Sequence, residues 1–385
     1  MTETRPVRPG EEIDIERLSE FLGRELGLPD GEIEVEQFPA GSSNLTYLVR
    51  LGRAEYVLRR PPFGNTVKSA HDMGREFDVL SKLSAVYAPA PKPLLFSRDA
   101  SIIGSEFYLM ERRHGLIIRG KIPGTHDSGR NASVNERAST PGTQPADAEA
   151  RTLVSTKHDL ETSQEFRQKV AKSFIQNLAD LHSLDVRKAG LENLGRADGY
   201  NRRQVEGWSK RYFAAKTDTW PDIEKAITWL NANIPTESGA SLIHNDYKFD
   251  NIMLDPADLT KVTAVLDWEM VTIGDPLMDL GTTLGYWMSW DAPEWLLDMP
   301  FNPRVLMENI SRSDLVEMYA TTLGRAVPDM LFYYVFGTFK IAVICQQIYA
   351  RFVKGFTKDE RFAGFNKFVA ALGRIAAIAM DKRHI

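Results

Sequence analysis

The stretch from Ser241 to Gly281 constrains the fold of this chain more than any other part of the sequence. It reads SLIHNDYKFDNIMLDPADLTKVTAVLDWEMVTIGDPLMDLG. Two apolar runs, Asn251 to Leu254 and Val262 to Leu266, flank the turn sequence Asp255-Pro256-Ala257-Asp258. Apolar runs on either side of such a turn are typical of a β-hairpin. We therefore expect a hairpin here, with polar residues at the outer end of each strand.

The polar residues at this end of the hairpin include three with side-chain oxygens, Asp246, Asn251 and Asp267. His244, Asp246, Lys248 and Asn251 lead into the first strand, and Asp267 follows the second. An Asp, an Asn soon after it and a second Asp returned by the hairpin can converge on one point. Such ligands suit Mg²⁺, which takes few protein groups together with substrate phosphates. The remaining carboxylate can accept a proton from an attacking hydroxyl, an arrangement described for phosphoryl transfer by kinases.

In these residues the chain resembles the aminoglycoside phosphotransferase-like (APH/choline kinase-type) family of small-molecule kinases. It is particularly similar to the kinase domains linked to acyl-CoA dehydrogenases. The motifs that carry the resemblance are H-x-D-x-x-x-x-N, D-W-E and G-D-P-x-x-D-L. The resemblance implies an α+β, bilobal protein-kinase-like fold, with a small β-rich N-lobe and a larger, mostly helical C-lobe. It also implies ATP and Mg²⁺ as cofactors.

The resemblance assigns catalytic roles to three residues of this stretch. Asp246 aligns with the catalytic base, and His244 aligns with the His that orients the catalytic loop. Lys248 stands where protein kinases carry a Lys and where this subgroup often carries Arg. Either cation can neutralise charge on the transferred phosphoryl group, so we expect Lys248 to do so.

The resemblance assigns the metal ligands and one structural residue as well. Asn251 and Asp267 align with the metal-binding Asn and Asp, and Asp279 aligns with an Asp that packs under the catalytic loop and fixes its backbone. The chain departs from the family at Asn245, where a Gly is usual, so the loop backbone is expected to differ slightly.

The first part of the chain is expected to bind the nucleotide. A small polar turn between two strand-like runs can offer N–H groups and hydroxyls to phosphates. By itself it reads better as an ordinary hairpin turn, and the family resemblance reverses that preference. In the family an Arg or Lys on the next strand pairs with phosphate and with a Glu on the following helix, and the backbone of the lobe linker meets the adenine. The residues concerned are Gly41, Ser42, Ser43 and Asn44 in the turn, Arg59 on the strand, Glu76 on the helix, and Met110, Glu111 and Arg112 in the linker.

Composition and resemblance together suggest three regions. Residues 1–113 are expected to form the N-lobe, residues 114–161 a lobe linker with an insertion, and residues 162–385 the C-lobe with the catalytic loop and substrate site. The segment from Lys121 to Glu161 is rich in Ser, Thr, Asn, Gly and Pro and lacks aromatic residues. Such a segment cannot bury enough apolar surface to offset chain entropy, so we expect it to be largely disordered. A capping-box pattern begins the next helix at Thr162.

Composition also limits the kinds of partner that this chain is expected to bind. The 385 residues carry a net charge of −5, which gives no general basic footprint for nucleic acid or for an anionic membrane. The most apolar segment, Met330 to Cys345, is interrupted by Lys340 and falls short of a bilayer span. The polar N-terminus is unlike a signal peptide, and the single cysteine, Cys345, fits a reducing compartment. We expect a cytoplasmic protein with no nucleic-acid or membrane partner.

The substrate is the least constrained feature. The resemblance implies a small molecule with a hydroxyl group, and the acyl-CoA-dehydrogenase-linked subgroup points to a hydroxyacyl-CoA and to an acyl-CoA dehydrogenase as a separate partner chain. Basic and aromatic residues mix in the segment Asn201 to Lys216. They suit a phosphorylated or nucleotide-bearing substrate, or else the aromatic residues belong to the core and the cations to a solvated face.

Three other interpretations compete with a small-molecule kinase. A protein kinase is disfavoured because the metal motif is D-W-E, because no Gly-rich loop signature or A-P-E segment is present, and because little chain separates Asp267 from Asp279. A catalytically silent nucleotide-binding or scaffold module is supported by Asn245 in place of Gly and by Arg59 in place of Lys. A metallohydrolase would use His244, Asp246 and Asp267 as ligands, and it would need a second ligand cluster that the seven scattered His residues do not supply.

Overall fold

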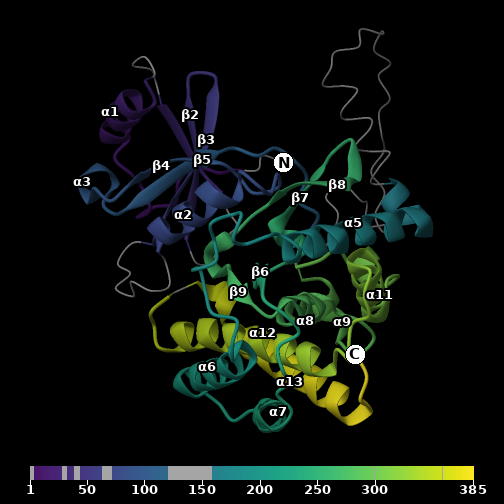
Figure 1. The fold of residues 1–385 in the computed structure, drawn as a ribbon. Coiled ribbons are helices and arrows are strands. Elements are labelled where there is room, and N and C mark those ends of the chain that lie inside the picture. The colour runs from purple at the N-terminus through teal and green to yellow at the C-terminus, as the bar shows by residue number, and fades with distance from the viewer. Residues whose placement is uncertain are drawn as a thin grey trace, which may run out of the picture. The chain divides into compact units, whose positions relative to one another are not determined.

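The computed structural model describes residues 4–27, 33–38, 44–62, 72–119, 158–299, 301–357 and 359–385. The chain divides into two compact units, which Figure 1 labels by element. Unit 1 comprises residues 1–114 with the short segments 187–191 and 264–269. Unit 2 comprises residues 115–186, 192–263 and 270–385.

Unit 1 is built on a five-stranded antiparallel sheet with the order β1-β2-β3-β5-β4. Helix α1 begins at the N-cap Asp14, whose side chain accepts from the Arg17 N–H, and α2 begins at Asp72 in the same way. The elements of this unit are α1 (Ile15–Leu26), β1 (Ile33–Gln37), β2 (Leu45–Leu51), β3 (Ala54–Arg60), α2 (Met73–Leu83), β4 (Pro93–Ser97), α3 (Ala100–Ile103) and β5 (Phe107–Glu111).

The two faces of this sheet receive different helices because successive strand residues point to opposite sides. Leu58 and Leu109 are paired across β3 and β5 and belong to an apolar cluster with Leu18 and Leu22 of α1. The next pair along, Arg59 and Tyr108, must point to the other face. That face carries α2, since Phe77 of α2 contacts the Tyr108 ring at 6.4 Å between ring centroids. The strand period therefore directs Arg59 toward α2.

Unit 2 is mostly helical, with two small two-stranded sheets. Strand β6 (Ser241–Ile243) pairs with β9 (Thr272–Gly274), and β7 (Ile252–Asp255) pairs with β8 (Asp258–Val265), whose last two residues belong to unit 1. The expected hairpin is thus present. The helices are α5 (Gln164–His182), α6 (Tyr200–Ala215), α7 (Pro221–Ala232), α8 (Pro276–Tyr286), α9 (Glu294–Leu297), α10 (Arg304–Met307), α11 (Arg312–Leu323), α12 (Leu331–Val353) and α13 (Phe365–Lys382), with short 3-10 turns η1 (Phe249–Asn251), η2 (Trp268–Met270) and η3 (Glu360–Phe362).

The start of α5 differs from the expectation. Ser163, and not Thr162, is the N-cap residue, and its hydroxyl accepts from the Phe166 N–H. Thr162 instead donates to the His158 carbonyl, because residues 158–162 are already helical. Of the segment expected to be disordered, residues 121–157 lie outside the described part of the chain, whereas Leu160 at its end is buried.

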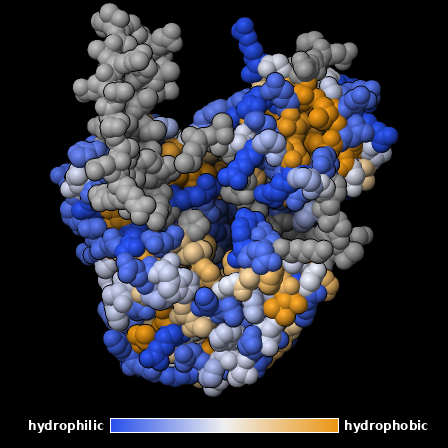
Figure 2. Space-filling view, turned by 180° about the vertical axis from the view of Figure 1, so that it is seen from behind, coloured by the Kyte–Doolittle hydropathy of each residue, from blue (hydrophilic) through white to orange (hydrophobic). Residues whose placement is uncertain are grey.

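Helix α12 is longer than its most apolar stretch suggests. Two helical stretches in the described residues, Leu331–Val353 and Glu360–Lys382, are long and apolar enough to cross a membrane by length and composition alone. The expectation that the apolar segment beginning at Met330 falls short of a bilayer span is therefore wrong by length and composition. In its most apolar window of 18 residues, however, 83% of the window is buried inside the structure, as in the core helix of a folded domain. Figure 2 shows one face of the molecule, on which hydrophilic residues predominate and hydrophobic residues gather in separate areas.

Candidate active site

A buried ion-pair cluster occupies the α2 side of the sheet in unit 1. Arg59 Nη1 donates to Glu76 Oε1 at 2.8 Å, and Arg59 Nη2 donates to Asp267 Oδ1 at 3.1 Å. The Arg59 and Glu76 side chains are only 9% and 2% exposed. Glu269 lies 3.9 Å from the same guanidinium. The structure therefore brings together the strand cation, the helix carboxylate and the Asp of the D-W-E motif.

Charge within this cluster is strongly coupled. Burial acts to lower the pKa of Arg59, but the facing carboxylates, Glu76 first, outweigh it and raise that pKa. Burial raises the pKa of Glu76, and the Arg59 charge opposes this. Arg59 therefore stays protonated, and its fork of donors suits the oxygens of a phosphate group as well as those of carboxylates.

The D-W-E motif is held in an uncommon backbone conformation. Asp267 has a φ of 67°, in the left-handed region that non-glycine residues seldom adopt. The next residue, Trp268, anchors the turn, since its indole N–H donates to the Val265 carbonyl at 2.8 Å and its ring packs on Tyr87. Strained backbone of this kind concentrates at functional sites. The turn thus presents the Asp267 carboxylate, which remains 32% exposed.

The nucleotide-covering turn is described only at its end. Gly41, Ser42 and Ser43 lie outside the described residues. Asn44 is buried, and its side-chain amide donates to Glu269 Oε2 at 2.9 Å. Asn44 is thus tied to the D-W-E turn.

The segment expected to contact adenine comprises the last two residues of β5, Met110 and Glu111, and the next residue, Arg112. The Glu111 N–H donates to the Lys92 carbonyl at 2.9 Å, so this donor is already used. The Arg112 guanidinium pairs with Glu55 at 2.6 Å, and the Met110 side chain is buried. The adenine contact expected of Met110, Glu111 and Arg112 stays a prediction.

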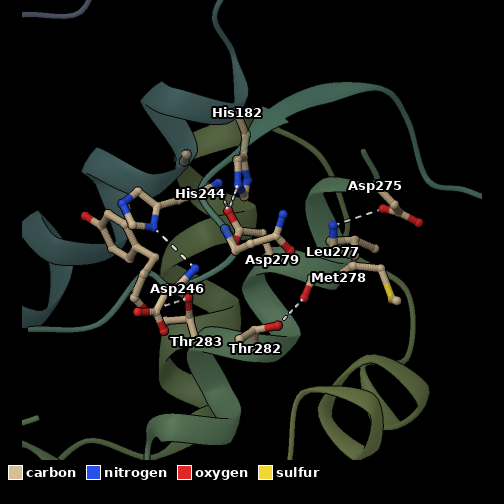
Figure 3. A network of polar contacts seen from close by, with 12 residues as sticks. His182, His244, Asp246, Asp275, Leu277, Met278, Asp279, Thr282 and Thr283 are labelled. Atoms are coloured by element: carbon tan, nitrogen blue, oxygen red, sulfur yellow. Dashed lines mark hydrogen bonds and ion pairs between the residues drawn. The ribbon is translucent and has the colours of Figure 1, made fainter. Parts of the chain in front are cut away.

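In unit 2 the buried carboxylate of Asp279 holds the loop that follows β6 (Figure 3). Its Oδ2 accepts the His244 N–H and its Oδ1 accepts the Asn245 N–H, each at 2.7 Å. Helix α8 positions this carboxylate, and the N-cap of that helix is Asp275, whose side chain accepts the Leu277 N–H. Asp279 therefore fixes two consecutive peptide groups directly before Asp246.

His182 also contacts the Asp279 carboxylate. Its Nε2 lies 3.1 Å from Asp279 Oδ2, and its Nδ1 lies 2.7 Å from the Tyr319 hydroxyl. Burial acts to raise the pKa of Asp279, but the hydrogen bond and charge of His182, with His244 and Lys340, lower it. The carboxylate is thus held ionised in the interior, where it accepts several donors at once.

Asp246 lies at the end of this loop, among three donors. Lys248 Nζ pairs with Oδ2, the Asn251 amide donates to Oδ2 at 3.0 Å, and the Tyr286 hydroxyl donates to Oδ1 at 2.7 Å. The Asp246 N–H donates to His244 Nδ1 at 3.2 Å. Burial acts to raise the pKa of Asp246, and the charge and hydrogen bond of Lys248 overcome it and lower that pKa. The carboxylate is therefore ionised at neutral pH.

Asn251 is oriented by its contacts with the loop. Its Nδ2 donates to both the backbone carbonyl and the side chain of Asp246, which leaves the amide oxygen as the end directed away from them. An amide oxygen here and a carboxylate at Asp267 are donors that Mg²⁺ accepts. Asn251 belongs to unit 2 and Asp267 to unit 1.

No group of three or more His, Cys, Asp or Glu side chains within the described ranges is placed to hold a metal ion, as a metallohydrolase would need.

Three residues of these networks escaped the sequence analysis. Glu269 follows Asp267 in the same motif and was recognisable only as part of that motif. Tyr286 lies on the same helix as Asp279, two turns further on, but a Tyr in an apolar helix ordinarily reads as core. Lys340 offered a clearer signal, because it is the single charged residue between Leu331 and Ala350.

The basic and aromatic segment on α6 is mainly engaged in internal contacts. Trp208 and Tyr212 are buried, while Phe213 is exposed. Arg203 donates to backbone carbonyls before α6, and Arg211 stacks over the Trp208 ring at 4.4 Å. The aromatic residues therefore belong mostly to the core.

The sheet of unit 1, the helical unit 2 and the loop held by Asp279 define a kinase-like phosphotransferase fold. A crystal structure of a candidate aminoglycoside phosphotransferase from Ralstonia eutropha is 26% identical, with a TM-score of 0.71 over 96% of this chain and 99% of that one. Choline kinase from Cryptosporidium parvum shares the fold at a TM-score of 0.60 and 12% identity, over 96% and 97% of the two chains. The predicted fold class is confirmed.

The chain belongs to the APH phosphotransferase enzyme family, whose model matches residues 34–138 and 144–300. It is similar to acyl-CoA dehydrogenase family member 11 of Gallus gallus, at 34% identity over 99% of this chain and 45% of that one. Family member 10 of Mus musculus is 31% identical, over 97% and 32%. The chain thus spans less than half the length of these curated relatives. The predicted family is confirmed.

Proposed function

We propose that this protein is an ATP- and Mg²⁺-dependent kinase that phosphorylates a hydroxyl group of a small molecule. The observation that carries the proposal is the setting of Asp246, an ionised carboxylate on a loop that Asp279 holds at two consecutive peptides. Membership of the phosphotransferase family supports the same reaction class.

The carboxylate of Asp246 has room for one more donor. An ionised carboxylate offers about four lone-pair sites, and among the described residues three side-chain donors reach it. Two of these donors are on Oδ2, so the remaining site on Oδ1 suits the hydroxyl of an acceptor. The lowered pKa makes Asp246 a weak base. A weak base is sufficient because the transition state of phosphoryl transfer is loose and positioning contributes most of the catalysis.

We propose that Asn251 and Asp267 hold Mg²⁺, which neutralises charge on the phosphates when it is bound. Their amide and carboxylate oxygens support this assignment. Arg59 would bind the ATP phosphates through its guanidinium, Gly41, Ser42, Ser43 and Asn44 would offer them further donors, and Lys248 would neutralise charge beside Asp246. His244 would orient the loop by accepting the Asp246 N–H.

For the acceptor we propose a hydroxyacyl-CoA, and for a partner a separate acyl-CoA dehydrogenase. The support is the similarity to acyl-CoA dehydrogenase family members along nearly the whole of this chain. We also propose a cytoplasmic location, which the single cysteine supports.

The test is ADP release with Mg²⁺ and ATP across a panel of alcohols: 4-hydroxyacyl-CoA esters, aminoglycosides, choline and simple sugars. Wild type is compared with Asp246→Asn and with Asp255→Asn, a matched control in the hairpin turn. We expect stimulation by the CoA esters that is lost in Asp246→Asn and retained in Asp255→Asn.

Each other outcome has a distinct meaning. Stimulation by a different alcohol would retain the kinase and refute the acyl-CoA substrate. Equal turnover in Asp246→Asn would refute the base. MgATP binding without transfer to any alcohol would favour a catalytically silent nucleotide-binding module over the kinase.

A further inference from the structure

Lys340 is a buried lysine that reaches the catalytic loop from α12. Lys340 is 1% exposed. Its Nζ donates to the Asn245 carbonyl at 2.6 Å and lies 3.3 Å from Asn245 Oδ1. The same Nζ lies 5.7 Å from the centre of the Trp208 ring, within the range of a cation–π contact. A lysine is almost never fully buried unless its charge is compensated, so this placement calls for a specific role.

A close helix crossing brings Lys340 to the loop. A Cβ on Gly337 of α12 would lie 2.1 Å from the Gly281 carbonyl of α8, and one on Gly285 would lie 2.9 Å from the Gly337 backbone. The two backbones therefore touch, which only glycine permits. Helix α8 carries Asp279, so the crossing places Lys340, one helical turn beyond Gly337, beside the loop that Asp279 also binds.

Lys340 acts on the one residue of the loop that adopts a left-handed conformation. Asn245 has a φ of 69°, which costs an ordinary residue about 1–2 kcal/mol and is better tolerated by Asn. Each polar group of Asn245 has a partner. Its N–H donates to Asp279, its carbonyl accepts from Lys340, and its side chain contacts the Met270 carbonyl and the Tyr200 hydroxyl.

We propose that Lys340 is a positioning residue for Asp246, which orients the base by fixing the peptide group between Asn245 and Asp246. The carbonyl of that peptide accepts from Lys340, and its N–H, which belongs to Asp246, donates to His244 Nδ1. With both ends of the peptide held, the direction in which the Asp246 side chain leaves the backbone is set. The catalytic meaning of this role rests on the proposed function, whereas the restraint on the loop does not.

The charges around Lys340 are mixed. Asp279 of α8 and Asp246 of the loop favour its charged form, and Lys248 of the loop and Arg211 of α6 oppose it. Burial dominates and lowers the pKa of Lys340 to about 8. The group is therefore an ammonium at neutral pH and loses its charge as the pH rises past that value, which weakens its hydrogen bond to Asn245.

The test measures amide hydrogen exchange in the peptide that covers residues 241–254, in the full chain without ligands. Lys340→Met removes the donor, Lys340→Gln keeps a neutral donor at the same side-chain length as Met, and Lys354→Met removes an exposed lysine just after the same helix. At neutral pH we expect exchange in the loop to be roughly tenfold or more faster in Lys340→Met, because a hydrogen bond to a charged group is lost. We expect Lys340→Gln to be intermediate and Lys354→Met to match wild type.

Wild type should also lose loop protection, relative to the intrinsic rate, as the pH rises past about 8, and Lys340→Gln should not. Loop exchange in Lys340→Met equal to that of Lys354→Met would overturn the proposal. A matching loss of protection in α13 would overturn it too, because Lys340 would then support unit 2 as a whole.

A second readout separates this proposal from the proposed function. The background hydrolysis of MgATP, with water as the acceptor, is followed against pH. We expect wild type to decline at alkaline pH, and we expect Lys340→Gln to have a lower rate without that decline. If wild type turns over ATP neither with water nor with any alcohol of the panel, the kinase proposal fails, while the exchange experiment still decides whether Lys340 restrains the loop.

Discussion

The substitution Asp279→Asn tests the support of the catalytic loop directly. The carboxylate accepts the N–H groups of His244 and Asn245, each at 2.7 Å, and lies 3.1 Å from His182 Nε2. Asparagine has nearly the same shape but keeps one acceptor oxygen and replaces the other with an NH₂ group. One of the two backbone N–H groups must then face a donor in the interior.

The magnitude follows from these contacts. A buried N–H without an acceptor costs about 1–3 kcal/mol. The remaining bonds lose the charge of the carboxylate, and bonds to charged groups are roughly twice as strong as neutral ones. We therefore expect the free energy of unfolding to fall by roughly 3–5 kcal/mol at neutral pH, as for a broken buried ion pair.

Urea unfolding followed by tryptophan fluorescence measures this change, with Asp381→Asn, an exposed carboxylate, as the control. The pKa of Asp279 is lowered from its ordinary value of 3.8, so its stabilisation is complete above that value and is lost as the pH falls below it. The difference between wild type and Asp279→Asn should accordingly shrink in acid. A loss at neutral pH no larger than that of the control would refute the reasoning.

Three further predictions concern other parts of the structure. Gly337→Ala, whose added Cβ would lie 2.1 Å from a carbonyl oxygen of α8, should lower the free energy of unfolding by about 3 kcal/mol. Gly364→Ala is the control: its added Cβ would meet open space, so its free energy of unfolding should stay unchanged. Equal urea midpoints for the two variants would contradict the close contact between α8 and α12. Arg59→Met leaves the carboxylate of Glu76 buried and unpaired and should cost roughly 3–5 kcal/mol by urea unfolding, so a loss under about 1 kcal/mol would count against the ion pair. Burial raises the pKa of Cys345 to about 12. This thiol should therefore resist labelling by 5,5′-dithiobis(2-nitrobenzoate) at pH 8 until urea unfolds the chain. Rapid labelling of the folded protein would show that the thiol is accessible.

Much of the architecture follows from local signals in the sequence. The helix of residues 15–26 begins at an Asp cap and ends at Gly27, which has a φ of 63°, and both are local signals. The hairpin after the catalytic loop lies where two apolar runs flank a turn. The errors are the length of the apolar helix α12 and the cap at Ser163 in place of Thr162, where residues 158–162 are already helical and Thr162 donates to the His158 carbonyl.

The sequence by itself also determined which residues are candidates for the chemistry, because the order of His244, Asp246, Asn251, Asp267 and Asp279 is a local pattern. What surrounds those residues was decided only by the tertiary structure. Tyr286 contacts Asp246 across 40 positions of sequence, His182 contacts Asp279 across 97, and Lys340 contacts Asn245 across 95. Helix packing makes these contacts, and above all the glycine crossing of α8 and α12. A Tyr, a His or a Lys within an apolar helix has no local signature that names its partner, since the partner is set by how the helices pack.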